Sequence, residues 1–204
     1  MTINLDAFMK IIKTHLPGVI VFEPKVFGDT RGFFLETYRE DVLQQAGLDV
    51  KFVQDNHSRS AQGVLRGLHY QMKQTQGKLV RVASGSVFDV AVDVRQGSPT
   101  FSQWFGTQLD EQTMRMMYVP PGYAHGFVVL SQSADFLYKC TDYYHPESEQ
   151  GIAWDDPDIG IDWPVAEISS MISLSGKDKN NILLKEQTQE NLPAYQDFML
   201  DMEK

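Results

Sequence analysis

The sequence predicts a mainly β fold of the sandwich, barrel or jelly-roll type. Short apolar segments recur along most of the 204 residues, and Gly, Pro, Asp and Ser residues separate them. Alternation with a period of two dominates, as expected for strands that bury one face. Helical periodicity is limited to three short segments. Many short strands at close spacing favour a double-sheet or closed β architecture.

Residues 85–95 show the strand pattern most clearly, because apolar and charged side chains alternate along them. One face carries Phe88, Val90, Val92 and Val94, and the other carries Asp89, Asp93 and Arg95. This pattern predicts a half-buried strand with a polar face. Further strands are predicted at residues 19–23, 33–38, 51–56, 64–71, 78–84, 101–108, 115–119, 125–131, 134–142 and 150–153.

Three segments are predicted to be helical: residues 4–14, 39–46 and 192–203. The first would place Leu5, Phe8, Met9 and Ile12 on one face. We expect this N-terminal helical extension, residues 1–17, to pack against the barrel or a dimer partner. The C-terminal tail, residues 183–204, is assigned no chemistry. The length of the chain predicts one domain over residues 1–204.

Composition narrows the possible partners and compartment. The formal net charge of −9 argues against nucleic-acid binding, which requires a basic face. No run approaches the ~20 apolar residues of a membrane-spanning helix, and the N-terminus lacks the features of a signal peptide. The single Cys140 cannot form an internal disulfide, and its aromatic strand-like setting favours packing over catalysis. We therefore predict a cytoplasmic protein without a membrane partner.

Two segments set a histidine beside glycines, residues 63–71 (GVLRGLHYQ) and 120–127 (PPGYAHGF). Glycine permits tight turns and close approach of a ligand, so His69 and His125 are expected to face a cavity. Histidine is also the side chain best suited to moving protons near neutral pH. These segments therefore predict acid–base or anion-binding histidines.

A metal site is the competing interpretation of these histidines. Strand-built metal sites often use a His-x-His pair, but Gln71 stands where the partner of His69 would be. His57 and His145 have no obvious companions. We therefore predict no bound metal. In the acidic, aromatic segment 154–163, a structured turn is favoured over a calcium site, because the alternating ligands of a calcium loop are missing.

Six segments together resemble the dTDP-4-dehydrorhamnose 3,5-epimerases, in that family's order and over roughly residues 18–180. They are residues 27–36 (FGDTRGFFLE), 54–60 (QDNHSRS), 63–71, 77–82 (GKLVRV), 120–127 and 174–178 (LSGKD). The resemblance implies a cupin-type jelly-roll barrel, a homodimer and no cofactor. It also implies conversion of dTDP-4-dehydro-6-deoxy-glucose to dTDP-4-dehydro-rhamnose.

The implied reaction needs a base, an acid and an oxyanion partner. A 4-keto sugar can lose the hydrogen at C3 or C5 to give an enolate, and inversion requires reprotonation from the opposite face. By resemblance, His69 is the base and the carboxylate of Asp178 orients it. Tyr138 matches the acid, and Lys78 is expected near the developing oxyanion.

The resemblance also implies a set of substrate-binding residues. Those expected at the diphosphate are Arg31, Arg66 and His125, where guanidinium groups suit phosphate geometry. Gln54, Asp55 and Asn56 are expected on the nucleotide side, and Glu36 is expected near Arg31. Tyr144 matches the aromatic residue that stacks on thymine, and Glu149 and Lys177 match further ligand contacts. The N-terminal strand is expected to cross to the partner, so that Arg31 and Glu36 serve the neighbouring site.

Three alternative functions remain open from the sequence. The first is a related enzyme on the same scaffold, either a mono-epimerase acting at C3 or C5 or a 3,4-ketoisomerase. The second is a non-catalytic sugar-nucleotide-binding cupin, and the third is a metal-dependent cupin oxygenase. The presence of all three acid–base residues favours the enzyme over the binding module.

Overall fold

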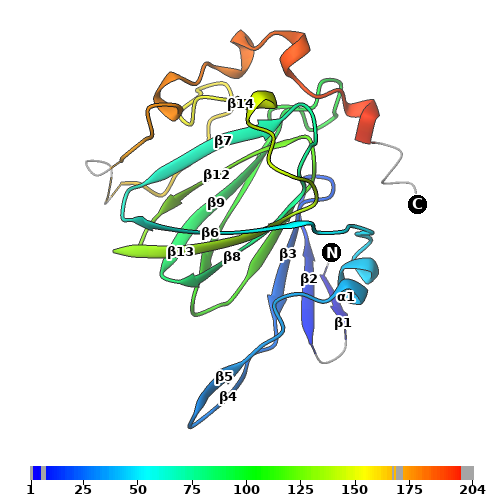
Figure 1. The fold of residues 1–204 in the computed structure, drawn as a ribbon, viewed down its shortest axis with the longest axis vertical. Helices are drawn as coiled ribbons and strands as arrows, with labels where there is room; N and C mark the ends of the chain where they lie inside the picture. The colour runs from blue at the N-terminus through cyan, green and yellow to red at the C-terminus, as the bar shows by residue number, and fades with distance from the viewer. Residues whose placement is uncertain (1, 6–7, 167, 169–171, 199–204) are drawn as a thin grey trace.

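The structure, a computed structural model, describes residues 2–5, 8–166, 168 and 172–198 (Figure 1). Its strands are β1 (Thr2–Leu5), β2 (Met9–Lys13), β3 (Ile20–Pro24), β4 (Phe27–Asp29), β5 (Gly32–Phe34), β6 (Gln54–Ala61), β7 (Leu65–Gln71), β8 (Lys78–Ser84), β9 (Ser86–Asp93), β10 (Trp104–Asp110), β11 (Met116–Val119), β12 (Tyr123–Val129), β13 (Ser133–Cys140) and β14 (Glu149–Gly151). The helix α1 spans Glu40–Gln45. Short 3-10 turns are η1 (Pro146–Ser148), η3 (Asp178–Asn180), η4 (Leu184–Glu186), η5 (Gln189–Asn191) and η6 (Tyr195–Phe198).

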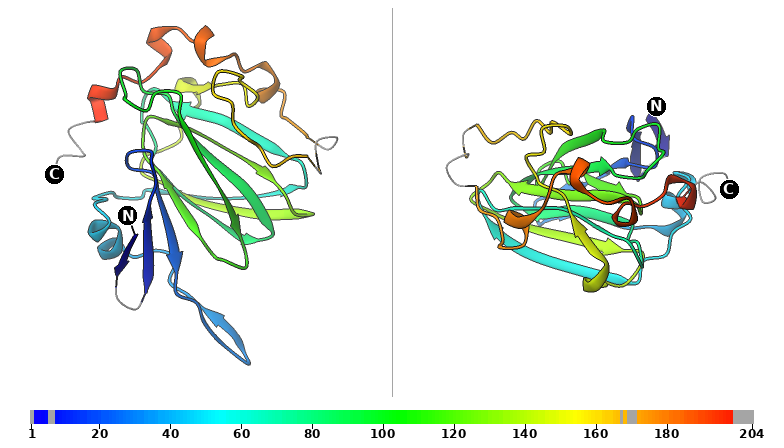
Figure 2. Two further views of the ribbon diagram at one scale, coloured as in Figure 1. Left: turned by 180° about the vertical axis from the view of Figure 1, so that it is seen from behind. Right: turned by 90° about the horizontal axis from the view of Figure 1, so that it is seen from above.

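Two sheets form the body of the molecule, and a separate hairpin projects from it. One sheet has the strand order β1-β2-β3-β11-β8-β13-β6, and the other has the order β10-β9-β12-β7-β14. The hairpin β4–β5 extends from one end of the long axis, while the chain after β14 gathers at the opposite end (Figures 1 and 2). The two facing antiparallel sheets make a jelly-roll barrel, so the predicted mainly β fold is confirmed.

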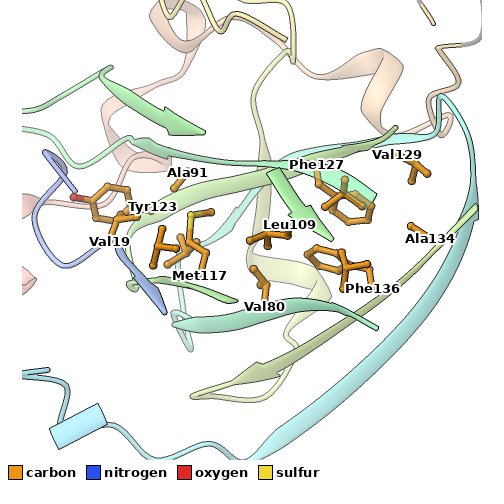
Figure 3. Close-up of a cluster of buried hydrophobic side chains, with 14 of the residues drawn as sticks. Val19, Val80, Ala91, Leu109, Met117, Tyr123, Phe127, Val129, Ala134 and Phe136 are labelled. Carbon is orange, nitrogen blue, oxygen red and sulfur yellow. The ribbon is translucent and has the colours of Figure 1, made fainter. Parts of the chain in front are cut away.

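The core between the sheets follows from the alternation of side chains along each strand. Val80 and Phe136 reach inward from the seven-stranded sheet, and Ala91 and Phe127 reach inward from the five-stranded sheet (Figure 3). The rings of Phe127 and Phe136 stack with centroids 4.1 Å apart, which joins the two sheets directly. This apolar cluster fixes the spacing of the sheets on which the polar groups of the barrel interior are mounted.

Both outer faces are covered in part. On the five-stranded sheet, Val90 and Val92 pack with Trp163, Leu184 and Leu192 from the chain beyond β14. On the seven-stranded sheet, a second cluster joins α1 to the outward side chains of β2, β3, β8 and β11; among its buried members are Val42, Leu43, Ile11, Phe22 and Leu79. The outward apolar side chains of these two clusters therefore have partners.

The predicted strand at 85–95 is β9, but its polar face is not exposed to solvent. Asp89, Asp93 and Arg95 are all buried. Asp93 accepts two hydrogen bonds from the Arg95 guanidinium, at 2.9 and 2.8 Å, and further ones from Ser98 and Thr100. The prediction of a half-buried strand was therefore wrong, because buried charges paired within the fold look the same in sequence as solvated ones.

The predicted N-terminal helix over residues 4–14 was also wrong. The chain forms β1 and β2 there, and β2 pairs with β3 in a register that places Ile11 opposite Phe22. Met9 and Ile11 alternate into the core with a period of two. The edge of β3 offers backbone hydrogen bonds to this segment and so selects a strand. Local periodicity does not reveal that β3 will be its neighbour.

Several other predictions agree with the structure. The helix predicted at 39–46 is α1, and the strand predicted at 78–84 is β8. The strand predicted at 51–56 starts later, as β6, and that predicted at 33–38 is the shorter β5. The C-terminal prediction is met only by the short turn η6, and residues 199–203 lie outside the described chain.

Two further predictions about packing are confirmed. Cys140 is fully buried in the barrel wall. In the acidic segment, the carboxylate of Asp156 accepts hydrogen bonds from the backbone N–H groups of Asp158 and Leu184, at 2.8 and 2.6 Å, and so builds a structured turn. Of the helices that the structure describes, none has the length and apolar character needed to span a bilayer.

Candidate active site

A pocket of about 330 Å³ opens into the barrel between the two sheets. Both sheets line it: β6, β8 and β13 from one, and β7, β12 and β14 from the other. Its predicted site residues are Gln54, Asn56, Arg66, His69, Lys78, His125, Tyr138, Tyr144, Glu149 and Asp178. Ten residues that lie far apart in the sequence therefore converge on one cavity.

The imidazole of His69 lies between two carboxylates. Its Nε2 is 2.5 Å from Asp178 Oδ1, and its Nδ1 is 3.6 Å from Glu149 Oε1. Burial raises the pKa of the Asp178 carboxyl, but hydrogen bonds from His69 and Ser175 outweigh burial and lower the pKa below its ordinary value. Asp178 is therefore an ionised acceptor that holds the ring in a fixed orientation.

Glu149 belongs to a short polar chain at the mouth of the pocket. Its Oε2 accepts a hydrogen bond from the Tyr144 hydroxyl at 2.7 Å and a second one from Lys177 Nζ. Burial raises the pKa of Glu149, and these two donors overcome it, so that the pKa is lowered. The same hydrogen bond raises the pKa of the Tyr144 phenol to about 12.

A bulge in β7 explains how Arg66 and His69 reach the same cavity. In a regular strand, residues three apart face opposite sides of the sheet. The β7–β12 pairing shifts register between His125 and Phe127, and Gly67 has a φ of +121°. A Cβ on Gly67 would lie 2.5 Å from the Gly126 backbone, so only glycine permits this approach. The bulge therefore turns both side chains inward.

Tyr138 and Lys78 enter the pocket from the other sheet. Tyr138 follows Phe136 on the inner face of β13, and burial raises the pKa of its phenol. Burial also lowers the pKa of the Lys78 ammonium, although the negative charges of Glu149 and Asp89 partly oppose this effect. A neutral phenol and a lysine thus face the wall that carries His69.

A second histidine–carboxylate pair lies deeper in the barrel. His125 Nε2 is 2.9 Å from Asp89 Oδ1, and both residues are buried. Burial raises the pKa of Asp89, with the charges of His125 and Lys78 acting against it. The second carboxylate oxygen of Asp89 has no hydrogen-bond partner among the described residues. The alternation of Asp89 with apolar residues was visible in the sequence. The pairing of Asp89 with His125 depends on the contact between β9 and β12.

Four predicted site residues do not line this pocket. Arg31 is highly exposed on the projecting hairpin and pairs with Asp29, while Glu36 pairs with Arg39. Asp55 faces outward from β6 and binds Lys139 Nζ at 2.9 Å. Lys177 contacts the pocket through Glu149. Among the described residues, neither Arg31 nor Glu36 therefore lines the pocket that holds His69.

Other pocket residues were not singled out from the sequence; they are Ser58, Tyr70, Gln76, Gly126, Phe127, Phe136 and Ser175. Ser58 follows from the alternation of β6, since it shares a face with Gln54 and Asn56. Gln71 also lines the pocket, and its amide binds backbone groups of two loops. In the described part of the chain, no three His, Cys, Asp or Glu side chains are grouped as a metal site.

Arg66 supplies a positive charge at the exposed side of the pocket. Its guanidinium donates to Ser60 Oγ, at 3.1 Å from Nη2. Among the described residues, no carboxylate lies within ion-pair distance of it. A guanidinium available in this way suits the doubly charged bridge of a nucleoside diphosphate.

A jelly-roll barrel with histidine, tyrosine, lysine and carboxylate side chains converging on its pocket is typical of cupin-type enzymes. The family model described as dTDP-4-dehydrorhamnose 3,5-epimerase matches residues 13–186, and the chain belongs to this family. The resemblance stated from the sequence motifs is thereby confirmed.

Similar proteins cover nearly the whole chain. A dTDP-4-dehydrorhamnose 3,5-epimerase from Pseudomonas aeruginosa is 58% identical over 172 residues, which are 84% of this chain and 93% of the relative. The crystal structure of a dTDP-6-deoxy-D-glucose-3,5-epimerase from Legionella pneumophila, in complex with dTDP-4-keto-L-rhamnose, is 54% identical with a TM-score of 0.88 and covers 92% of this chain and 98% of that one. A 3′-monoepimerase from Streptomyces bikiniensis, in complex with dTDP-quinovose, is 34% identical with a TM-score of 0.85, over 93% and 96% of the two chains.

Proposed function

We propose that the protein epimerises dTDP-4-dehydro-6-deoxy-D-glucose at C3 and C5, giving dTDP-4-dehydro-L-rhamnose in dTDP-rhamnose biosynthesis. The observation that carries this proposal is the position of the His69–Asp178 pair on one side of the pocket and of Tyr138 on the opposite sheet. Inversion beside a ketone needs a base and an acid on opposite faces of the sugar ring. The 3,5-epimerases also share more identity with this chain than the monoepimerase does, 58 and 54% against 34%.

In the proposed mechanism, His69 removes the proton. Asp178 holds Nε2, which leaves the lone pair of Nδ1 to accept the proton from C3 or C5. The C–H electron pair moves into the ring and onto the C4 oxygen, where the ammonium of Lys78 stabilises the enolate. Tyr138 then donates a proton to the opposite face of the same carbon. One proton leaves and one arrives at each carbon, and exchange with water then takes the proton from His69 and restores the phenol of Tyr138, so the steps balance without a cofactor.

The nucleotide half of the substrate would occupy the outer part of the pocket. We assign the diphosphate to Arg66 on the exposed side of the pocket, with Lys177 and Glu149 at its side and His125 reaching it from the buried end. Tyr144 is half exposed at the mouth of the pocket and would offer its face to the base. Gln54 and Asn56 line the same pocket from the inner face of β6. Asp55 faces away, and a contact from it would require the chain to move.

The mechanism is tested by solvent exchange in deuterated water. Wild type is expected to incorporate deuterium at C3 and C5, as followed by NMR. His69→Ala is expected to lower the exchange rate by about 10²–10⁴-fold, the usual contribution of a general base. His15→Ala, which removes an exposed histidine outside the pocket, is the matched control. Full exchange in His69→Ala would remove His69 from the mechanism.

The alternative functions give different results in the same assay. A mono-epimerase, the activity named for the Streptomyces bikiniensis relative, would label only one carbon. A ketoisomerase would move the carbonyl, which product NMR would detect. A non-catalytic binding protein would bind a dTDP-sugar without exchange, and an oxygenase would depend on added metal and be sensitive to chelators.

We also propose a single-domain, cytoplasmic protomer that works as a homodimer. The support for a dimer is the projecting hairpin, which exposes Phe27, Phe33 and Phe34 at 42%, 60% and 65% of their surface. Apolar side chains on an extended arm indicate a protein partner. A second copy would receive this arm, and with it Arg31 and Glu36. The single buried Cys140 agrees with a reducing compartment.

A further inference from the structure

Three glutamine side chains hold the short loop that carries Tyr144. The loop, residues 141–145, follows β13 and has no regular secondary structure. Its backbone groups therefore need partners from elsewhere in the fold. The partners are the carboxamides of Gln54, Gln71 and Gln76, which we call the glutamine cradle.

Each carboxamide of the cradle binds a different part of the loop. Gln76 Nε2 donates to the carbonyl of Asp142 at 2.9 Å. Gln54 Oε1 accepts from the backbone N–H of Tyr144 at 3.0 Å. Gln71 Oε1 accepts from the N–H of His145 at 3.0 Å, and its Nε2 also lies 3.4 Å from the carbonyl of Tyr143.

Gln71 is the centre of the cradle and uses both ends of its amide. While Oε1 holds the 141–145 loop, Nε2 donates to the Gln74 carbonyl at 2.7 Å. The side chain is buried, so neither end is satisfied by bulk water. A carboxamide can donate and accept at once, whereas a carboxylate of the same shape can only accept. Position 71 therefore requires glutamine, because glutamate could not donate to the Gln74 carbonyl.

The consequence of the cradle is a fixed position for an exposed aromatic ring. Tyr144 is 54% exposed at the pocket mouth, and its hydroxyl is anchored on Glu149. With its backbone held by Gln54 and its ring by Glu149, the side chain has little freedom to lose when a ligand binds. A flat, pre-positioned ring of this kind is suited to stacking on a nucleobase.

We propose that the glutamine cradle positions Tyr144 as the platform for the base of a nucleoside diphosphate, and thereby sets affinity for the nucleotide half of the substrate. Gln71 and Gln76 are positioning residues, because they act through the loop. This inference rests on the proposed function for the identity of the ligand. Its test does not depend on that function. Binding of dTDP alone is measurable whether or not the protein catalyses exchange.

The test is a double-mutant cycle in which calorimetry measures the Kd of dTDP. Gln71→Glu is expected to raise the Kd of dTDP about tenfold, from the loss of hydrogen bonds to the loop. In a Tyr144→Ala background the same change is expected to add less than about twofold, because the platform is already absent. Gln74→Glu introduces the same charge at an exposed position nearby and is the matched control, with a Kd close to wild type.

Two further measurements keep the outcome decisive. Gln71→Glu is expected to raise KM while kcat for the proton-transfer reaction changes less than about twofold, a separation that general loss of structure would not give. Gln76→Glu, at a less buried position, is expected to show the same separation with a smaller change. Additive effects of Gln71→Glu and Tyr144→Ala, or an unchanged Kd in Gln71→Glu, would overturn the proposal. Absence of exchange in the wild type with intact dTDP binding would instead count against the proposed function alone.

Discussion

His69 is held by groups that suit a base acting beside a negatively charged substrate. Asp178 and Glu149 both have lowered pKa values, so both carboxylates remain ionised near neutral pH. In the proposed mechanism the nearer one, Asp178, would stabilise the positive charge that the ring takes on after accepting a proton. Glu149 is already bound by Lys177 and Tyr144, which leaves it less free to attract the ring away from Asp178.

Replacement of Tyr138 by phenylalanine separates the two halves of the reaction. Tyr138→Phe removes the proposed acid but keeps the ring that packs beside Phe136. We expect proton removal to survive better than completed inversion, because the base is untouched. Deuterium incorporation into recovered substrate, compared with formation of inverted product by NMR, measures the two steps. If both fall equally, the phenol shapes the pocket and donates no proton.

At the residue scale, local motifs predicted the site better than its supporting contacts. His69, Arg66 and His125 stand beside glycines that mark a bulge and a close approach, and these signals are local. The pairing of His125 with Asp89 and the role of Gln71 depend on which strands and loops become neighbours. Residues 36 and 74 positions apart form these contacts, so sequence spacing carries no record of them.

The edge strand β6 is joined to β13 by a charged cluster as well as by its backbone ladder. Asp135 accepts from Arg59 Nη2 at 2.7 Å and lies 2.9 Å from His57 Nε2, and both partners are on β6. Hydrogen bonds from Arg59 and then His57 lower the pKa of Asp135 from 3.8 to about 2. This carboxylate is thus bound more strongly in the folded state than in the unfolded chain.

Stability is therefore expected to depend on Asp135 in the acid range. A carboxyl group whose pKa is depressed on folding stabilises the folded state above its unfolded pKa, and this contribution is lost as the pH falls through the folded value. The difference in free energy of unfolding between wild type and Asp135→Asn should be constant above about pH 5 and shrink from about pH 4 towards pH 2. Urea unfolding at several pH values measures it, and Asp155→Asn, at an exposed aspartate, is the control. A difference that stays constant down to pH 2 would contradict this assignment.

At the element scale, strands were predicted where one face alternates clearly, and errors arose where a tertiary partner decides. β8 was predicted with its observed bounds because residues 78–84 alternate and end at Gly85. β2 was mistaken for a helix, since Met9 and Ile12 also fit a period of 3.6 and only the edge of β3 selects a strand. The buried state of Asp93 and Arg95 likewise depends on the Ser98, Thr100 and Tyr123 partners that folding supplies.

For the whole molecule, the hairpin β4–β5 is the feature that supports the proposed homodimer. It extends away from the body (Figure 1), exposes three phenylalanines and carries Arg31 at its tip. If the arm of one protomer serves the pocket of the other, an Arg31 variant and a His69 variant damage different parts of a shared site. Mixing them can then restore complete sites.

Subunit exchange tests this arrangement. Arg31→Ala and His69→Ala, each weakly active alone, are denatured together and refolded. Random pairing makes half of the dimers hybrid, and one of the two sites in each hybrid is intact, so about a quarter of wild-type activity should return. Refolding each variant separately is the control. Recovery no greater than the mean of the two separate samples would show that each site is complete within one chain.

The proposed base and acid stand on different sheets, with the Phe127–Phe136 stack beneath them. Facing sheets pack about 10 Å apart, a gap that admits a single sugar ring with a side chain on each face. The distance between the proposed base and the proposed acid is thus set by the size of the apolar side chains packed between the two sheets. Adding or removing a methylene group in this apolar core would change the spacing of the two sheets. The rate of proton transfer would then change although no reacting group had been altered.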